Sequence, residues 1–274
     1  MSDLAEFAKL TAALKPWTHQ LVFVGGWAHR LYRQHPLADP PAYMPLATRD
    51  ADVAFADSAQ LTGSIERALI QAGFTEELMG EHRPPVSHYT LGGEDAGFYA
   101  EFLTPLRGPA TRRDGGADAT VETAGITAQK LRHLELLFRS PWSVTVPAEP
   151  SIDTNTPAEI RIPNPVTFII QKVLIRKSRR LDKRAQDVLY IHDTLELFGS
   201  QLPVLADLWV NDVSLALSDD LRSDVAGGVR EMFSTVTETL RAAARIPPDR
   251  SLSPERMQAF CEQAIGEVLL RRSA

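Results

Sequence analysis

Two short stretches carry the residues with the clearest capacity for chemistry. In the first, the apolar residues Leu21 to Val24 run directly into Gly25-Gly26, and a helical pattern follows. Such an apolar run is typical of a buried strand, and the glycines end it. A glycine turn between a strand and a helix lets the backbone approach an anion closely and points free N–H groups at it. The first stretch therefore predicts a phosphate-binding turn.

The second stretch places two carboxylates side by side. Asp50 and Asp52 lie two residues apart in a strand-like run that follows Thr48, so both side chains project from the same face. Two carboxylates aimed at a phosphate repel each other and the phosphate unless a cation lies between them. Hard oxygen ligands of this kind suit Mg²⁺, and Mn²⁺ is the second cation that fits them. We therefore predict a divalent-cation site at these aspartates.

A third acid, Glu101, lies within the otherwise apolar run from Phe98 to Leu103. The alternation of this run, preceded by the strand-like residues 86–91, predicts a hairpin with Glu101 on its second strand. A buried glutamate is costly unless it is paired or bound to a metal. The alternative is that Glu101 points to solvent from a half-exposed sheet.

Together these residues resemble the polymerase-beta-type nucleotidyltransferase superfamily, and within it the GSU-type and abortive-infection (AbiEii, MenA-like toxin) nucleotidyltransferases. The shared features are a Gly-Gly-x-Ala turn and a Thr-x-Asp-x-Asp strand, matched here by Gly25, Gly26, Ala28, Thr48, Asp50 and Asp52. The resemblance implies that the three acids are catalytic and bind two metal ions. It also implies that Gly25, Gly26 and Thr48 bind the nucleotide.

A basic helical stretch extends the resemblance. Residues 172–184 contain seven lysine or arginine side chains. In the resembling families, a lysine on such a helix and an aspartate on the next helix complete the nucleotide site, and Lys172 and Asp187 stand at these positions. The lysine would act as a point charge on the phosphates, and the aspartate would orient the lysine or the acceptor. The alternative for such a charge run is a solvated helix face.

The resemblance implies transfer of a nucleoside monophosphate from a nucleoside triphosphate to an acceptor hydroxyl. The acceptor could be the 3′ end of tRNA, bound through the 172–184 segment, as in the toxin of a toxin–antitoxin pair with a cognate antitoxin. A small molecule or a protein hydroxyl is the alternative acceptor. A different class of function, a catalytically inactive nucleotide- or partner-binding module, is suggested by Gly25-Gly26, where many relatives have Gly-Ser.

The fold expected from the pattern and the resemblance is α+β. The 274 residues, 44% hydrophobic and 23% charged, suffice for one large or two modest domains. Five prolines between Pro147 and Pro165 suggest a boundary. We predict a nucleotidyltransferase catalytic domain over residues 1–148, with a mixed sheet flanked by helices. A helical bundle over residues 149–274 would complete the nucleotide and acceptor site.

Composition limits the partners and the compartment. The net charge of −6 argues against coating of nucleic acid along the whole surface but leaves room for a local basic groove. The longest apolar runs are too short to cross a membrane, and the acidic N-terminus lacks an apolar signal core, so we expect a cytoplasmic protein. The single cysteine, Cys261, is expected to fill a buried helix position.

Four further expectations concern local structure. Helical patterns cover residues 58–72 and 127–138. The proline-rich segment from His35 to Pro45 forbids regular structure and is either a surface excursion or a lid. His192-Asp193 suggests a catalytic dyad, but adjacent residues on a helix do not normally face each other, which argues against one. Residues 107–118 are expected to form a loop whose arginines, Arg107, Arg112 and Arg113, are solvated or touch a phosphate.

Overall fold

The structure, a computed structural model, describes residues 3–92, 97–111, 116–147 and 157–269. The chain divides into two compact units. The first consists of Met1–Leu31 and Ala47–Pro163, and the second of Tyr32–Leu46 and Asn164–Ala274. The first unit extends past residue 148, where the prolines suggested a boundary, because strand Ala158–Ile162 pairs back onto strand Trp142–Val146.

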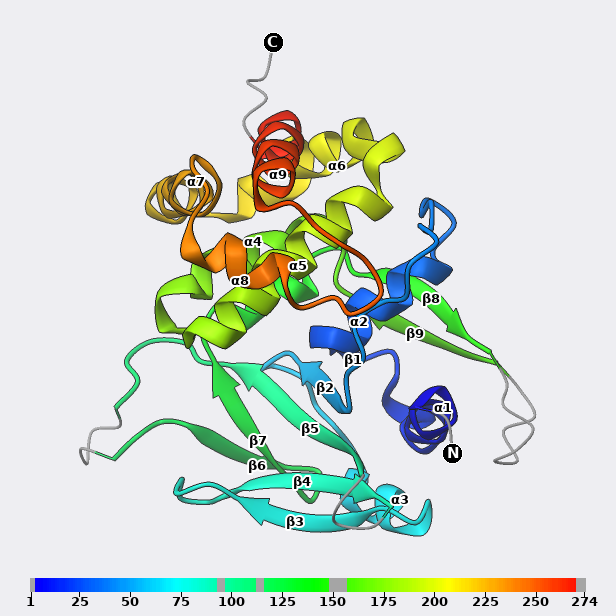
Figure 1. Ribbon diagram of the computed structural model, residues 1–274. Coiled ribbons are helices and arrows are strands. Elements are labelled where there is room, and N and C mark those ends of the chain that lie inside the picture. The colour runs from blue at the N-terminus through cyan, green and yellow to red at the C-terminus, as the bar shows by residue number, and fades with distance from the viewer. Residues whose placement is uncertain (1–2, 93–96, 112–115, 148–156, 270–274) are drawn as a thin grey trace. The chain divides into compact units, whose positions relative to one another are not determined.

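The first unit is built on a seven-stranded mixed sheet (Figure 1). Its strands are β1 (Leu21–Val24), β2 (Asp50–Phe55), β3 (Thr75–Met79), β4 (Val86–Leu91), β5 (Phe98–Pro105), β6 (Thr120–Thr123) and β7 (Ile126–Leu131). The main path runs β1-β2-β5-β4-β3, and β7, which also pairs with β6, pairs with β5. β5 is parallel to β2 and β7, and the other pairs are antiparallel. The two strands with the predicted acids are therefore neighbours.

An aromatic cluster anchors two helices of this unit to the sheet. Phe7 on α1 (Asp3–Ala13) stacks on Trp27 of α2 (Gly25–Leu31), with ring centroids 4.0 Å apart. Phe23 of β1 and Phe98 of β5 meet this pair edge-on, at 5.3 Å and 5.9 Å. All four residues of β1 are buried. The unit also contains η1 (Lys15–Trp17), α3 (Ile65–Gln71), η3 (Leu134–Phe138), β8 (Trp142–Val146) and β9 (Ala158–Ile162).

The second unit is helical. Its α-helices are α4 (Pro165–Ile175), α5 (Leu181–Leu197), α6 (Leu202–Leu208), α7 (Asp219–Phe233), α8 (Glu238–Ala244) and α9 (Pro254–Leu269). The unit also contains shorter helical segments: η2 (Tyr32–Gln34), η5 (Arg176–Ser178), η6 (Gly199–Gln201), η7 (Trp209–Val213) and η8 (Ser214–Ala216). Asn164, Ser218 and Thr237 cap α4, α7 and α8 with side-chain oxygens that accept backbone N–H bonds.

The predicted α+β class is confirmed, since a mixed sheet with helices precedes a helical region. The predicted helix over 127–138 is wrong. Residues 126–131 form β7, and only 134–138 turn helically, as η3. Leu134 and Leu137, two apolar residues of this range, belong to a buried cluster with Val22 and Leu103. Pairing of β7 with β5 and β6 overrides the local pattern.

The other differences lie at helix ends and in segments without a clear pattern. The helix predicted from Ser58 begins at Ile65, where Ser64 caps it by accepting a bond from Arg67 N. The strands β3, β6 and β9 were not expected. The turn of the predicted hairpin, between residues 91 and 98, falls largely outside the described residues. No helix in the described ranges is long and apolar enough to cross a membrane.

Candidate active site

The Gly25-Gly26 turn and the Thr48–Asp52 stretch meet in the structure. Gly25 follows β1 directly and has φ +64°, a conformation that L side chains rarely adopt. A Cβ on Gly25 would collide with the Asp52 carboxylate, and one on Gly26 would lie 2.9 Å from the Thr48 side chain. Both glycines are therefore required by close approach to the second stretch, and the turn presents bare backbone beside Asp52.

The three acids share one face of the sheet. In the register of the parallel pair β2–β5, Asp52 lies opposite Glu101 and Asp50 lies opposite Tyr99. Residues two apart on a strand point the same way, so all four side chains project from the same side. The Thr48 hydroxyl, which belongs to a buried residue, donates to the Asp50 carboxylate. Thr48 thus orients one acid, and strand pairing places the others.

The negative charges of all three acids affect the pKa of Tyr99. The pKa of its hydroxyl is raised above the ordinary value, first by burial and then by the negative charges of Asp50, Glu101 and Asp52. Each carboxylate disfavours ionisation of a neighbouring phenol, so a raised pKa with these causes reports a shared negative field. Such a field attracts a cation. Sequence reasoning did not single out Tyr99.

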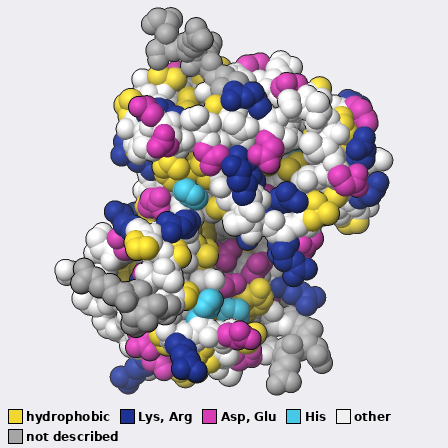
Figure 2. Space-filling model, turned by 90° about the vertical axis from the view of Figure 1, so that its left-hand side faces the viewer, with side chains coloured by type: hydrophobic (Ala, Val, Ile, Leu, Met, Phe, Trp, Pro, Cys, Tyr) yellow, Lys and Arg dark blue, Asp and Glu magenta, His cyan; other side chains and the backbone are white. Residues whose placement is uncertain are grey.

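His88 is the second residue that the sequence interpretation missed. It lies opposite Glu101 on β4, with 3.5 Å between its Nε2 and Glu101 Oε2. Its ring stacks on Tyr99, with centroids 5.3 Å apart and planes inclined by 8°. The Glu101 side chain is only 18% exposed. Glu101 therefore does not point freely to solvent. His88 supplies part of the pairing that a buried glutamate requires. Figure 2 shows acidic side chains grouped beside histidine on the first unit.

The donor set on this face fits a divalent cation. It consists of carboxylate oxygens, the ligands that Mg²⁺ and Mn²⁺ prefer, next to a turn that admits no side chain. Among the described residues, one group of acidic and histidine side chains has all its ligand atoms within 4.8 Å of one another, and it does not contain these three acids. The oxygens of the three acids are therefore spaced more widely than this. One cation bound by all three acids would require their side chains to rotate towards it.

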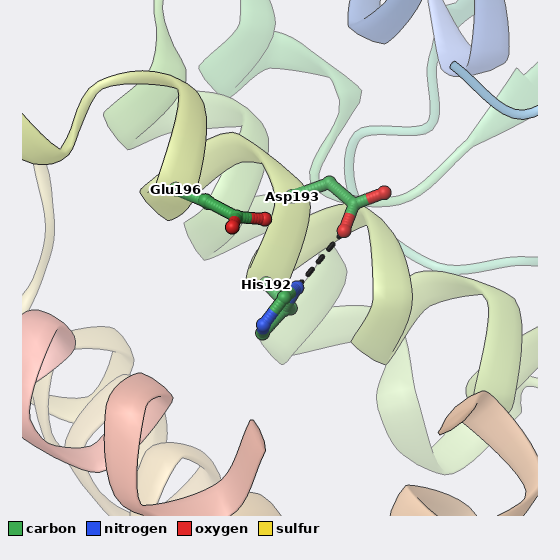
Figure 3. A group of neighbouring side chains, drawn as sticks. All are labelled: His192, Asp193 and Glu196. Carbon is green, nitrogen blue, oxygen red and sulfur yellow. Dashed lines mark hydrogen bonds and ion pairs between the residues drawn. The ribbon is translucent and has the colours of Figure 1, made fainter. Parts of the chain in front are cut away.

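That compact group is His192, Asp193 and Glu196 on α5 (Figure 3). His192 Nδ1 lies 2.9 Å from Asp193 Oδ1, so the argument that these neighbours do not face each other is wrong. Arg250 explains the geometry, since its Nη2 donates to both Asp193 oxygens at 2.7 Å and 2.6 Å. Tyr43 donates to Glu196 at 2.6 Å. A guanidinium that already neutralises Asp193 opposes a metal ion, and the group serves as a structural network.

Lys172 and Asp187 meet in the second unit. Lys172 Nζ lies 2.5 Å from Asp187 Oδ1, and both side chains are buried. The ammonium also lies over the rings of Phe168 and Tyr190, at 4.7 Å and 4.8 Å from their centroids. Arg179 Nε is 3.3 Å from Asp187 Oδ2. The two residues that the resemblance paired are thus a buried ion pair braced by aromatic rings.

The other cations of residues 172–184 differ in exposure: some are buried and some are exposed. Arg176 is buried and donates to Glu231 at 2.8 Å and to Asp224 at 2.9 Å. Lys177 and Arg180 are exposed by 69% and 88%, and each lies 3.6 Å from an acidic side chain. Exposed pairs of this kind are weak, so these two cations stay available to a phosphate. The segment therefore combines a buried structural half with an accessible basic half.

Of the three arginines named in the loop 107–118, the structure describes Arg107. Arg107 pairs with Asp57, with 3.0 Å between Nε and Oδ2, and its side chain is 66% exposed. Because an exposed pair of this kind is weak, a contact between Arg107 and a phosphate stays a prediction. Arg112 and Arg113 lie outside the described residues.

Comparison with known proteins shows the family of the chain. A family model described as nucleotidyltransferase, NTP_transf_8, matches residues 2–214, a range that contains every site residue named above except Glu231, Asp224 and Arg250. No curated protein matches the sequence. Among solved structures, the nucleotidyltransferase toxin MenT4 from Mycobacterium tuberculosis H37Rv is similar at 13% identity and a TM-score of 0.38, over 99% of this chain and 84% of that chain.

Proposed function

The chain belongs to the nucleotidyltransferase family, and from this premise we propose that it transfers a nucleoside monophosphate from a nucleoside triphosphate to an acceptor hydroxyl at the acidic face of its sheet. The observation that carries the proposal is the register of β2 and β5, which aligns Asp50, Asp52 and Glu101 on one face beside the bare Gly25 backbone. Clustered carboxylates repel one another, so their alignment is costly unless a cation is bound there.

Each residue has a proposed role. Asp50, Asp52 and Glu101 would hold two Mg²⁺ ions, or Mn²⁺. The chemistry that bound metal supplies is neutralisation of the phosphate charge and a lower pKa of the acceptor hydroxyl. Thr48 keeps one Asp50 oxygen turned in a fixed direction. The backbone of Gly25 and Gly26 would contact the phosphates, because no side chain intervenes.

The reaction needs little covalent participation from the protein. The acceptor oxygen forms a bond to the α-phosphorus while the bond from that phosphorus to the bridging oxygen breaks, and pyrophosphate leaves with the electron pair. The acceptor proton passes to solvent or to a carboxylate of the site. Lys172 would contribute its charge to nucleotide binding, with Asp187 fixing its position at 2.5 Å.

We propose RNA as the acceptor class, with the 3′ end of tRNA as the first candidate. The exposed cations Lys177 and Arg180 support this choice, because contacts to a phosphate backbone need accessible positive charge. A role as the toxin of a toxin–antitoxin pair, held inactive by a cognate antitoxin, follows from the same resemblance. A small molecule or a protein hydroxyl is the alternative acceptor, and an inactive binding module is the alternative function.

The test is label transfer from each α-labelled nucleoside triphosphate, with Mg²⁺ and with or without total RNA. Asp52→Asn should reduce transfer by roughly a hundredfold or more, the scale of losing one preorganised electrostatic contact. Asp57→Asn is the matched control, because Asp57 lies two residues after the end of β2 and is paired with Arg107. Equal transfer by Asp52→Asn and wild type would refute the site.

The location of the label separates the alternatives. Label on RNA supports the proposed acceptor, and label on the protein itself redirects the assignment to a protein hydroxyl. Triphosphate binding without any transfer would support an inactive module.

A further inference from the structure

An imidazole lies in one row with two of the acids across three neighbouring strands of the first unit. Glu101 of β5 lies opposite Asp52 of β2 on one side and opposite His88 of β4 on the other. Residues that lie opposite each other in a strand pair project from the same face of the sheet. The acidic face therefore carries the nitrogen donor of His88 in addition to its three carboxylates.

The ring of Tyr99 fixes the orientation of this imidazole. The rings of His88 and Tyr99 are stacked, with centroids 5.3 Å apart and planes inclined by 8°. Tyr99 and Glu101 lie two residues apart on β5, so the stacked imidazole is held beside the Glu101 carboxylate. The side chains of His88 and Glu101 are 21% and 18% exposed, which leaves an ion access from solvent. A donor that is already oriented loses less conformational freedom on binding.

The distance between His88 and Glu101 fits two ligands of one ion better than a hydrogen bond. His88 Nε2 lies 3.5 Å from Glu101 Oε2, whereas N–H···O hydrogen bonds measure about 2.7–3.2 Å. Adjacent ligand atoms on one metal ion lie roughly 3.0–3.4 Å apart, because their bonds to the ion measure about 2.0–2.2 Å. A small rotation of the two side chains would therefore let both contact one cation.

We propose that His88 Nε2 is a ligand of the cation at Glu101, and that this nitrogen makes the acidic face prefer a first-row transition metal such as Mn²⁺ over Mg²⁺. Mg²⁺ takes oxygen ligands, whereas imidazole nitrogen binds transition metals. The family resemblance points to the three acids, and His88 joins them through the register of β4 and β5. The inference rests on the proposed function and adds the identity of one metal.

The first test compares the affinities of the full chain for the two ions, without nucleotide. Free Mn²⁺ is followed by its electron paramagnetic resonance signal during titration, and Mg²⁺ is then added as a competitor. His88→Phe keeps a ring that can stack on Tyr99 and removes the nitrogen. We expect this variant to bind Mn²⁺ about tenfold more weakly or worse, and Mg²⁺ within about twofold of wild type, because loss of a group that merely supports a ligand already costs about tenfold.

The second test detects the nitrogen itself. Pulsed electron paramagnetic resonance of Mn²⁺ bound to the wild-type protein should show coupling to an imidazole nitrogen, and His88→Phe should lack it. His19→Phe is the matched control, because it removes an exposed imidazole from the turn before β1, at the end of that strand away from Asp52. Both the affinities and the coupling should be unchanged in His19→Phe. Circular dichroism reports whether each variant is folded, and the wild-type coupling needs no variant.

Three outcomes would overturn the proposal. Wild-type protein could bind Mn²⁺ no more tightly than Mg²⁺, or without nitrogen coupling. His88→Phe could weaken both ions by the same factor, which would mean that His88 acts only through Glu101. The nitrogen coupling could persist in His88→Phe, which would place the ion at another histidine, such as His192 in the compact group on α5.

These measurements are independent of transfer activity. Label transfer by a wild-type protein without nitrogen coupling would refute the His88 ligand and leave the proposed function standing. Selective Mn²⁺ binding through His88, in a protein that transfers no label, would refute the proposed function and leave the metal ligand standing.

Discussion

At the scale of single residues, the site depends on the absence of a side chain at Gly25 and Gly26. Gly25 has φ +64°, and its missing Cβ makes room for the Asp52 carboxylate. Gly227, within α7, has nothing within 4 Å of where a Cβ would be. The same substitution should therefore act in opposite directions at the two positions.

Gly25→Ala should lose transfer activity and about 1–2 kcal/mol of stability, because an L side chain is strained in this conformation and displaces Asp52. Gly227→Ala should keep activity and gain about 0.5–1 kcal/mol, because alanine is the better helix residue. Label transfer and urea unfolding of both variants check the prediction. Equal stability changes of the same sign would contradict it.

Cys261 is another residue whose behaviour follows from its surroundings. It is fully buried on α9, as the sequence led us to expect. Burial, reinforced by the negative charges of Asp193 and Glu196, raises the pKa of its thiol well above the ordinary 9.0. Because the raised pKa favours the neutral thiol, the reactive thiolate stays scarce as the pH passes 9.

We therefore expect the folded protein to react slowly with a thiol reagent, with no rise in rate from pH 8 to about 9.5. Urea-denatured protein should react faster as the pH rises through the ordinary pKa. The rate of disulfide exchange with a chromogenic reagent, followed at several pH values, measures both. A folded-state rate that follows the denatured one would show that Cys261 is accessible.

At the scale of elements, α4 and α5 are joined by the buried pair of Lys172 and Asp187. Removing one partner of a buried pair strands the other charge, which typically costs about 3–5 kcal/mol, whereas replacing both with apolar residues is often neutral. A structural role and a nucleotide-binding role can therefore be separated by comparing single and double variants.

Lys172→Met should destabilise the protein by several kcal/mol, and Lys172→Met with Asp187→Leu should recover most of that loss. Transfer activity should stay low in both, because neither retains the lysine charge. Urea unfolding and label transfer are the two measurements. Recovery of activity in the double variant would assign Lys172 a structural role alone.

At the scale of the whole molecule, the chain enters the helical unit twice. The Tyr32–Leu46 segment belongs to that unit, although the strands on either side of it, β1 and β2, pair in the first unit. Asp39 N donates to Leu197 O at 2.9 Å, and Met44 N donates to Asp249 at 2.9 Å. Arg250 lies 3.3 Å from the centroid of the Tyr43 ring. The proline-rich segment is therefore held by the backbone of α5 and by side chains from the loop before α9.

Tyr43→Ala should speed hydrogen exchange at the Met44 and Asp39 amides, because the ring that Arg250 covers and the bond to Glu196 are both lost. Met44→Ala is the matched control, since the Met44 side chain is 72% exposed. Exchange in β2 should stay slow in both variants. Unchanged exchange at Met44 in Tyr43→Ala would show that backbone bonds alone hold the segment.

The parts that sequence predicted well are those in which local pattern and local chemistry agree. The apolar run of β1, the glycines after it and the alternation of Asp50 and Asp52 all refer to neighbours within a few residues. The helical class of the C-terminal part follows from the same periodicity. For this reason the glycine turn after β1, the strand that carries the paired aspartates and the α+β class could be predicted without a structure.

Tertiary structure decided which distant residues meet. His88 and Tyr99 join the acids only because β4 and β2 flank β5, and Arg250 turns Asp193 towards His192 across 57 residues of chain. Residues 126–131 became a strand because β5 and β6 offered partners. Periodicity records which way a side chain faces along its own element, whereas pairing between elements depends on long-range contacts that no local pattern contains.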